Sequence, residues 1–335
     1  MRGYTVMKLQ MNPSYMMLFS LVFLCTTISS SMASLQLGFY QQTCPLAESI
    51  VRLTVTEAVA MDPGLAPALL RMHFHDCFVR GCDGSVLLES TPTNPSERES
   101  PANKGSLRGF EVIDIAKANL EWQCPQIVSC ADILAFAARD AVLLTGGIDY
   151  ALPSGRRDGH VSSAPEVVKN LPSPFFDAEK LTQNFASKGF TRREMVTLSG
   201  AHSFGVSHCS SFTNRLYSFN ATHAQDPSMD PSLAARLKSM CPGRAGGPNP
   251  TVPFVNRFPH KLDNKYYRNL KKMKGLLTSD QTLLSSPSTA GIVWRHAKHH
   301  HKWTDEFAAA MVKLGSVGVL TGDEGEVRKN CGFVN

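Results

Sequence analysis

Apolar residues recur at helical spacing along most of this chain. In the stretch from Pro63 to Glu89 the pattern predicts a buried helix that also carries Arg71 and His75. These two residues are four positions apart, so they lie on one face of the predicted helix. An Arg or a His in an apolar setting is expected to have a polar partner or a chemical function. A fixed cation beside a proton acceptor suits chemistry in which a proton is taken up while negative charge develops.

The same periodicity predicts most of the remaining structure. We expect helices over residues 46–60, 110–122, 129–144, 177–188, 192–198, 210–218, 228–240, 265–273 and 303–317. Ser129, with Asp132 three positions later, predicts a capped start for the third of these helices. The ranges 90–106, 146–174 and 242–259 are polar or rich in Gly and Pro and are expected to be loops. Because few segments alternate between apolar and polar positions, the predicted fold class is mainly α.

The second half of the stretch, which ends at Glu89, offers two kinds of metal ligand. Its possible oxygen ligands are the side chains of Asp76, Asp83 and Ser85 and the main-chain carbonyls of Val79 and Gly81. Oxygen ligands on a short flexible loop are what Ca²⁺ prefers. The competing nitrogen and sulfur ligands, which suit Zn²⁺, are His73, His75, Cys77 and Cys82.

Cysteine usage favours calcium over zinc. Basic residues, an apolar run and small residues predict a signal peptide over residues 1–35, which leaves a mature domain over 36–335. No other run approaches the roughly 20 apolar residues of a membrane span. The mature domain contains eight cysteines, an even number that predicts four disulfides in a secreted protein. If all eight are paired, no thiolate remains for zinc.

Surface charge and short motifs add three expectations. The formal net charge is +6, or +4 without Arg2 and Lys8 of the leader, and we interpret this charge as diffuse. A mildly basic secreted protein is expected to adhere to acidic polysaccharide, whereas nucleic acid is not an expected partner. Asn220 begins the one sequon without Pro in the middle and is the predicted N-glycosylation site. We interpret four histidines as a solvated surface tract: His296, His299, His300 and His301.

A second candidate for chemistry is His202, in the run SGAHSFG at positions 199–205. Its small neighbours Gly200, Ala201 and Gly205 are expected to let a flat ligand approach the backbone. A neutral imidazole there could bind iron if a carboxylate held its other nitrogen. Asp280 is a candidate for that carboxylate, although nothing in its spacing singles it out.

These motifs resemble those of the secreted plant haem peroxidases of class III. The resemblance rests on RMHFHDCFVRGCDGSVLL, VSCADILAFAARD, LPSGRRDG, TLSGAHSFG, LDNKYY, GLLTSDQ, LTGDEGEVRKNC and the eight cysteines, in this order over residues 36–335. It implies two helical halves with haem b between them and the disulfides Cys44–Cys124, Cys77–Cys82, Cys130–Cys331 and Cys209–Cys241. It also implies a monomeric enzyme of the apoplast or cell wall. This enzyme would reduce H₂O₂ and oxidise two phenolic donors by one-electron steps, in lignin and wall chemistry or under oxidative stress.

The resemblance also implies roles on the peroxide side of the haem. His75 would take a proton from H₂O₂, and Arg71 would stabilise the negative charge that develops. Asn103 would accept the other ring N–H of His75, and Glu97 would hold Asn103 in place.

On the opposite side, His202 would bind the haem iron and Asp280 would accept its Nδ1–H. Phe74 would pack over the haem, and Pro172 would line the site of the phenolic donor.

Two calcium sites follow from the same resemblance. The distal set matches in full: Asp76, Val79, Gly81, Asp83 and Ser85. The proximal set matches only at Ser203 and Asp263, because Val255 and Phe258 replace a carboxylate and a hydroxyl ligand. Since Ca²⁺ binding depends on the number and charge of oxygen ligands, we expect the proximal site to be weak or empty.

Two other functions compete with this one. A zinc hydrolase built on the His and Cys cluster fails on cysteine pairing and lacks an HExxH helix. A wall-associated protein with the same fold but impaired catalysis is disfavoured, because every residue assigned to the two histidine sites is present. The altered proximal calcium site is the one feature in its favour.

Overall fold

Helices form nearly all the regular structure in the residues that the computed structural model describes, which are 34–243, 249–255 and 260–335. The mainly α prediction is confirmed. The predicted leader lies outside the described residues up to position 33. Leu35–Asn335 forms one compact unit, and within the described part of the chain no helix is long and apolar enough to cross a membrane.

The helical elements are α-helices and short 3₁₀ turns, and the 3₁₀ turns are labelled η. Up to residue 146 they are α2 (Ala47–Met61), α3 (Leu65–Val79), η1 (Ser85–Leu87), η2 (Glu97–Glu99), α4 (Phe110–Gln123) and α5 (Cys130–Gly146). From residue 164 to 240 they are α6 (Ala164–Asn170), α7 (Ala178–Ser187), α8 (Arg192–Leu198), η3 (Ser199–Ser203), η4 (Cys209–Ser211), α9 (Thr213–Tyr217) and α10 (Pro231–Met240). The last are α11 (Lys265–Leu270), α12 (Thr278–Gln281), η5 (Thr282–Leu284), α13 (Pro287–Lys298) and α14 (His300–Leu314).

The predicted helices are found with small shifts at their ends, and the Ser129 cap is confirmed by a 3.1 Å bond from the Asp132 amide to Ser129 Oγ. The helix expected over 210–218 is a turn followed by the short α9. Helices α6, α12 and α13 were not predicted. In α13 two of the three buried positions, Thr289 and His296, are polar, so the apolar period is hidden.

The interpretation of His296 as part of a solvated tract is therefore wrong. Its side chain is fully buried, and its Nε2 lies 2.9 Å from Thr197 Oγ1. Burial lowers the pKa of His296 to about 4, so the ring is neutral and serves the packing of α13 against α8. His299 and His301 are exposed, as expected.

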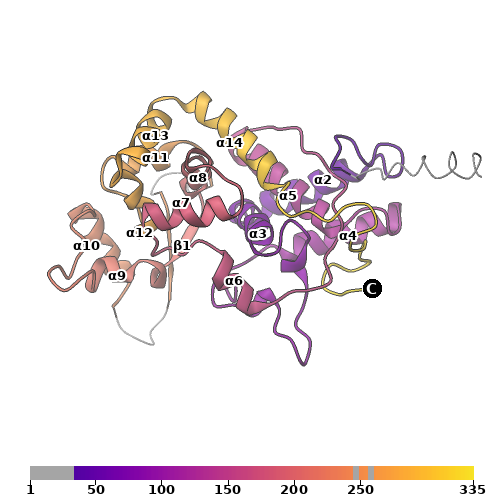
Figure 1. Cartoon of the computed structure of the whole chain (residues 1–335), viewed down its shortest axis with the longest axis horizontal. Helices are drawn as coiled ribbons and strands as arrows, with labels where there is room; N and C mark the ends of the chain where they lie inside the picture. The colour runs from indigo at the N-terminus through magenta and orange to yellow at the C-terminus, as the bar shows by residue number, and fades with distance from the viewer. Residues whose placement is uncertain (1–33, 244–248, 256–259) are drawn as a thin grey trace, which may run out of the picture. The chain divides into compact units, whose positions relative to one another are not determined.

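Helix packing falls into two groups (Figure 1). In the first group α2, α3 and α4 pack on α5, and in the second α8, α11, α13 and α14 pack on one another. One continuous apolar core runs through both groups and contains Phe78, Phe136 and Trp303. Two helical groups around a shared core are consistent with the expected haem peroxidase fold.

A small sheet lies within the second part of the chain. Strand β1 (Val206–His208) pairs antiparallel with β2 (Thr251–Pro253), with Ser207 opposite Val252. Part of the loop expected over 242–259 is thus a strand. The sheet shares a smaller apolar cluster with α9 and α10, and Figure 1 shows these two helices side by side.

All four predicted disulfides are confirmed: Cys44–Cys124, Cys77–Cys82, Cys130–Cys331 and Cys209–Cys241. Cys130–Cys331 closes the longest loop, 201 residues, and joins the start of α5 to the C-terminal segment. The sulfur atoms of Cys77 and Cys82 lie close to His73, as a zinc site would require. Because these sulfurs are bonded to each other, they offer no thiolate for zinc.

Candidate active site

Helix α3 holds Arg71 and His75 one turn apart, as predicted. The Nδ1 of His75 lies 2.7 Å from Oδ1 of Asn103. Because an amide oxygen only accepts, this nitrogen carries the proton and Nε2 is left as an acceptor. Burial, followed by the nearby charge of Arg71, lowers the pKa of His75 well below its ordinary value. The ring is therefore a neutral base with one defined open nitrogen.

Glu97 contacts Asn103 through its main chain. Asn103 donates from Nδ2 to the main-chain oxygen of Glu97 at 2.9 Å, so the carboxylate is not involved. Both carboxylate oxygens of Glu97 are buried and make no hydrogen bond among the described residues. Burial raises the pKa of the Glu97 carboxyl group to about 8. The nearby Ser85 hydroxyl lowers this pKa in part, although the two groups form no hydrogen bond of normal geometry.

Arg71 is fixed by neutral oxygens. It donates to the carbonyls of Ser106 and Ala102 at 2.9 Å each and to the Ser106 hydroxyl at 3.2 Å. No carboxylate pairs with it in the described part of the chain. Burial lowers its pKa to about 10, so it keeps its charge at neutral pH. Residues 102–106 thus position both Arg71 and His75. Sequence reasoning missed Ala102 and Ser106, because main-chain acceptors leave no residue signature.

His202 is the next-to-last residue of η3, and its two ring nitrogens have different surroundings. Nδ1 lies 2.7 Å from Oδ1 of Asp280, and the His202 side chain is 37% exposed. Asp280 is buried and also accepts bonds from the Leu277 amide at 2.9 Å and the Tyr266 hydroxyl at 3.2 Å. No described residue bonds to Nε2. A rigidly held imidazole with one open nitrogen suits a metal ligand.

Phe254 completes this site and was not predicted. Its ring stacks on the imidazole of His202 with the ring centres 4.4 Å apart and an angle of 6° between the planes. Phe254 directly follows β2, so the small sheet places it. Its position in an expected loop rich in Gly and Pro gave no sign of this contact.

Two of the small neighbours of His202, Gly200 and Gly205, face packed side chains where room for a flat ligand was expected. A Cβ on Gly200 would lie 2.6 Å from the Tyr267 hydroxyl oxygen and 2.7 Å from Trp303 Nε1. Gly205 has a φ of +84°, and a Cβ there would lie 2.9 Å from Pro67 Cβ. The Gly205 contact also brings the segment after His202 against the first turn of α3, the helix that carries Arg71 and His75.

The contacts of Phe74 and Pro172 do not point to a specific role for either residue. The ring of Phe74 lies 4.2 Å from that of Phe78 and 6.1 Å from that of Phe185 between centres, so it belongs to an aromatic cluster. It also lies edge-on to His75 at 6.1 Å. Pro172 is partly buried and follows the C-terminus of α6.

The oxygen-rich loop after α3 brings its predicted ligands together. Both carboxylate oxygens of Asp76 accept main-chain amides, from Gly84 at 3.0 Å and Val86 at 3.3 Å. Burial raises the pKa of Asp76, and the charges of Asp83 and Glu97 raise it further. The Ser85 hydroxyl is buried without a partner among the described residues. Clustered buried carboxylates beside an unpaired hydroxyl fit a bound cation.

The two carbonyls of the predicted calcium set make contacts of their own. The Val79 oxygen accepts a 3.3 Å bond from Nζ of Lys188, and the Gly81 oxygen accepts the Asp83 amide at 2.8 Å. Each carbonyl has a second lone pair that stays available.

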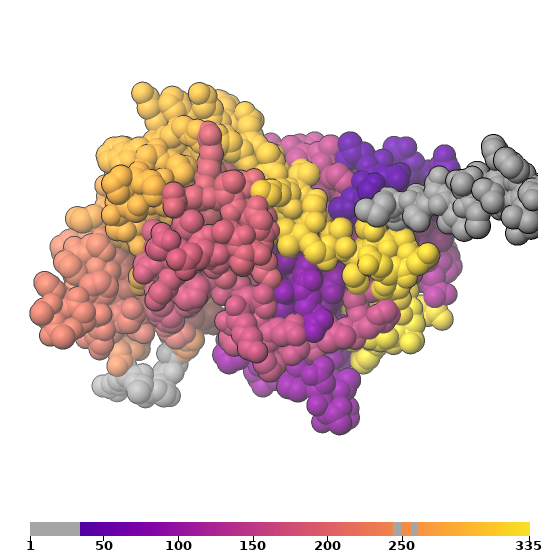
Figure 2. Space-filling view, viewed as in Figure 1, coloured from indigo at the N-terminus to yellow at the C-terminus, as the bar shows by residue number. Residues whose placement is uncertain are grey.

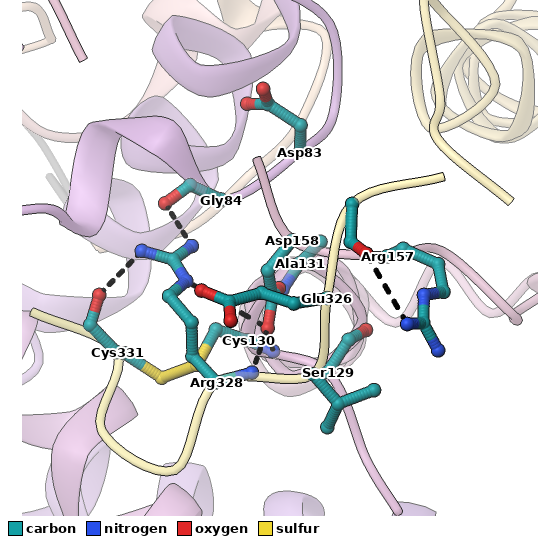
Figure 3. Close-up of polar contacts among 12 residues, drawn as sticks. Asp83, Gly84, Ser129, Cys130, Ala131, Arg157, Asp158, Glu326, Arg328 and Cys331 are labelled. Carbon is teal, nitrogen blue, oxygen red and sulfur yellow. Dashed lines mark hydrogen bonds and ion pairs between the residues drawn. A yellow bond between two sulfur atoms is a disulfide. The ribbon is translucent and has the colours of Figure 1, made fainter. Parts of the chain in front are cut away.

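A buried ion pair supports this loop from the C-terminal side (Figure 3). Arg328 donates to the carbonyls of Gly84 and Cys331 at 2.7 Å each, and its amide donates to Asp158 at 2.9 Å. Asp158 also accepts the amide of Ala131, at the start of α5, at 2.8 Å. The side chains of Arg328 and Asp158 are fully buried. One charged pair therefore joins the loop, helix α5 and the C-terminal segment.

The predicted proximal calcium ligands are already occupied within the protein. Ser203 Oγ accepts the Asp263 amide at 3.0 Å, and the Asp263 carboxylate accepts the Lys265 amide at 2.7 Å. Nζ of Lys265 lies 3.5 Å from the same carboxylate. Val255 is buried, and Phe258 lies outside the described residues. These side chains do not fit a calcium site, because the one carboxylate is neutralised by a lysine.

Comparison with known proteins agrees with this geometry. A family model described as Peroxidase matches residues 51–299. Peroxidase 5 of Vitis vinifera is 55% identical over 315 residues, which cover 94% of this chain and 95% of that protein. Peroxidase 1 of Zea mays is 47% identical over 312 residues, covering 92% and 85%. Peroxidase 3 of Arabidopsis thaliana is 46% identical over 316 residues, covering 93% and 96%. The chain belongs to the peroxidase family, among the class III peroxidases of plants, and is a peroxidase enzyme.

Proposed function

We propose that this peroxidase is secreted, holds haem b between His75 and His202, and oxidises small phenolic donors with H₂O₂. The observation that carries the proposal is the pairing of a neutral imidazole with an uncompensated arginine. The Nδ1 of His75 is bound by Asn103, and Arg71 has only carbonyl and hydroxyl partners.

The residues around His202 fit haem. Asp280 accepts the Nδ1–H and gives the ring more negative character, which strengthens Nε2 as an iron ligand. Phe254 prevents the ring from tilting by stacking on it. When bound, haem iron supplies the electron transfer that reduces H₂O₂ and then oxidises the donors.

His75 and Arg71 act on the peroxide. The open Nε2 of His75 accepts a proton from one peroxide oxygen and then donates it to the other, which leaves as water. The guanidinium of Arg71 stabilises the negative charge that forms on the departing oxygen. Since Arg71 has no carboxylate partner in the described residues, its full charge is available for this task.

The donor is proposed to be a small phenol that gives up one electron. Each H₂O₂ takes two electrons, so two donor molecules are oxidised in each cycle. Pro172 follows α6 at the partly buried edge where the donor would bind. Asn220, the proposed glycosylation site, is exposed in a loop, as glycan attachment in a secreted chain requires.

The experiment that tests this function is a count of donor oxidised per peroxide consumed. Purified holoprotein with limiting H₂O₂ and excess guaiacol is expected to yield two oxidised donors per peroxide. Peroxide loss that does not depend on guaiacol would contradict the proposed donor chemistry.

Metal analysis provides a separate prediction about calcium. We expect one calcium ion per holoprotein, bound at the distal loop, because the carboxylates of Asp76, Asp83 and Glu97 lie close together there. The proximal site is expected to be empty, because Asp263 is paired with Lys265. The variant Asp83→Asn is expected to contain none, and Asp263→Asn to keep its single ion. Two ions in the unmodified protein would disprove the assignment of the proximal site.

A further inference from the structure

Positive charge is concentrated in one segment of this protein. Residues 260–302 contain nine Lys and Arg residues and two acidic residues, whereas the full sequence contains 34 and 28. The rest of the chain therefore holds 25 basic and 26 acidic residues. The expectation that the charge is diffuse is wrong, because this segment accounts for the whole positive excess.

The structure gathers these cations on neighbouring elements. We use the term basic face for the exposed cations of α11, α13, the start of α14 and the adjoining turns: Lys261, Arg268, Lys271, Lys272, Lys298 and Lys302. Helix α11 packs on α13, and α13 packs on α14, as Figure 1 shows. The gold-coloured part of this region lies at the molecular surface in Figure 2.

Two observations show that cations of the basic face lie close to residues on the later helices α13 and α14. Nζ of Lys271 lies 3.9 Å from the ring centre of Trp294 on α13. Burial lowers the pKa of His300, at the start of α14; the charges of His301, Arg268 and Lys261 lower it further, and the charge of Asp263 raises it. Residues from before α11, within α11, after it and on both later helices thus share one region.

The charges of the basic face are not neutralised by the protein itself. Among the described residues none of its six cations forms an ion pair with a carboxylate. Two nearby acids are paired with other cations: Asp263 with Lys265, and Glu306 with Arg193 and Arg295. Asp305, three positions after Lys302 on α14, is exposed and is the acid closest in sequence to that lysine. A concentrated and unpaired positive surface attracts polyanions over a distance of about one Debye length, ~10 Å at 0.1 M salt.

Trp294 adds an apolar platform in the same place. Its side chain is 54% exposed, and Lys298 lies one helical turn further along α13. An exposed indole flanked by Lys271 and Lys298 suits a sugar ring, whose C–H groups stack on the aromatic face while its carboxylate meets an ammonium group.

We propose that the basic face binds an acidic polysaccharide, with uronate carboxylates on its lysines and a sugar ring on Trp294. The choice of a polysaccharide over a nucleic acid rests on the proposed secretion, because an extracellular plant protein is surrounded by uronate polymers. The surface itself is independent of the haem chemistry.

Binding of polygalacturonate to the holoprotein, measured by titration at low and high salt, tests this proposal. The triple variant Lys271→Gln, Lys298→Gln, Lys302→Gln is expected to bind at least about tenfold more weakly, because each lysine contributes to the local field. The matched control is Lys169→Gln, Lys180→Gln, Lys329→Gln, which removes the same charge from other exposed positions. It is expected to bind as the unmodified protein does. Trp294→Ala is expected to weaken binding severalfold without changing the salt dependence.

Equal weakening by both triple variants would show that only net charge matters and would overturn the proposal. Tighter binding of single-stranded DNA than of polygalacturonate at matched charge would overturn the choice of partner. Guaiacol oxidation is measured on every variant and is expected to be unchanged. A protein that is inactive but still binds the polymer through this surface would contradict the proposed enzyme function and would support the proposed binding by the basic face.

Discussion

Replacing His75 with Ala is expected to slow the consumption of H₂O₂ by about 10²–10⁴-fold, the usual contribution of a positioned acid–base group. The variant loses the one imidazole whose Nδ1 is bound by Asn103 and whose Nε2 is open. Haem is expected to remain bound, because His202 and Asp280 are not changed. The measurement is the rate of peroxide consumption in stopped flow, together with the haem content of the purified variant.

The Asn103 contact makes this prediction more specific. Asn103→Ala removes the acceptor that keeps the proton on Nδ1, so a smaller loss of rate is expected than for His75→Ala. His223→Ala changes an exposed histidine in the Asn220 loop and should match the unmodified protein. A His75→Ala protein that consumes peroxide at nearly the unmodified rate would refute the role proposed for His75.

Arg328→Met is expected to lower the free energy of unfolding by about 3–5 kcal/mol, because removing one partner of a buried ion pair leaves the other charge unpaired. Asp158 would lose its buried cation, and the carbonyls of Gly84 and Cys331 would lose their donors. Chemical denaturation with the disulfides intact measures the change. Since Arg328 holds the Gly84 carbonyl, the variant is also expected to bind calcium more weakly.

The matched control for this variant is Arg108→Met. Arg108 pairs with Asp62 at the surface, where both side chains are about half exposed. An exposed pair contributes no more than about 1 kcal/mol, so this variant should unfold almost as the unmodified protein does. Equal losses for the two variants would show that burial of the Arg328 pair has no special effect.

The sequence predicted side chains better than it predicted their partners. Spacing alone placed Arg71 and His75 on one helical face, because a four-residue interval has one geometric meaning in a helix. The resemblance supplied Asn103, Asp280 and the disulfides. The two shorter bonds from Arg71 go to the carbonyl oxygens of Ala102 and Ser106, which every residue has, so no pattern could reveal them.

Three interpretations were wrong because the sequence does not show which residues become buried, or which come together, when the helices pack. His296 lies between basic residues, yet it is buried where α13 meets α8. Gly200 leaves space for Tyr267 and Trp303, where a ligand had been expected. The basic residues of 260–302 are scattered along three helices and the turns between them, and only packing brings them onto one surface.

The absorption spectrum of the haem-containing protein, recorded before and after one equivalent of H₂O₂, tests the central claim most directly. The account predicts a Soret band that changes within seconds of peroxide addition and returns when guaiacol is added, because His202, His75 and Arg71 act as one set. A Soret band that does not respond to peroxide would contradict the proposed roles of His75 and Arg71. A folded, disulfide-intact protein without a Soret band would contradict the assignment of His202 as the iron ligand.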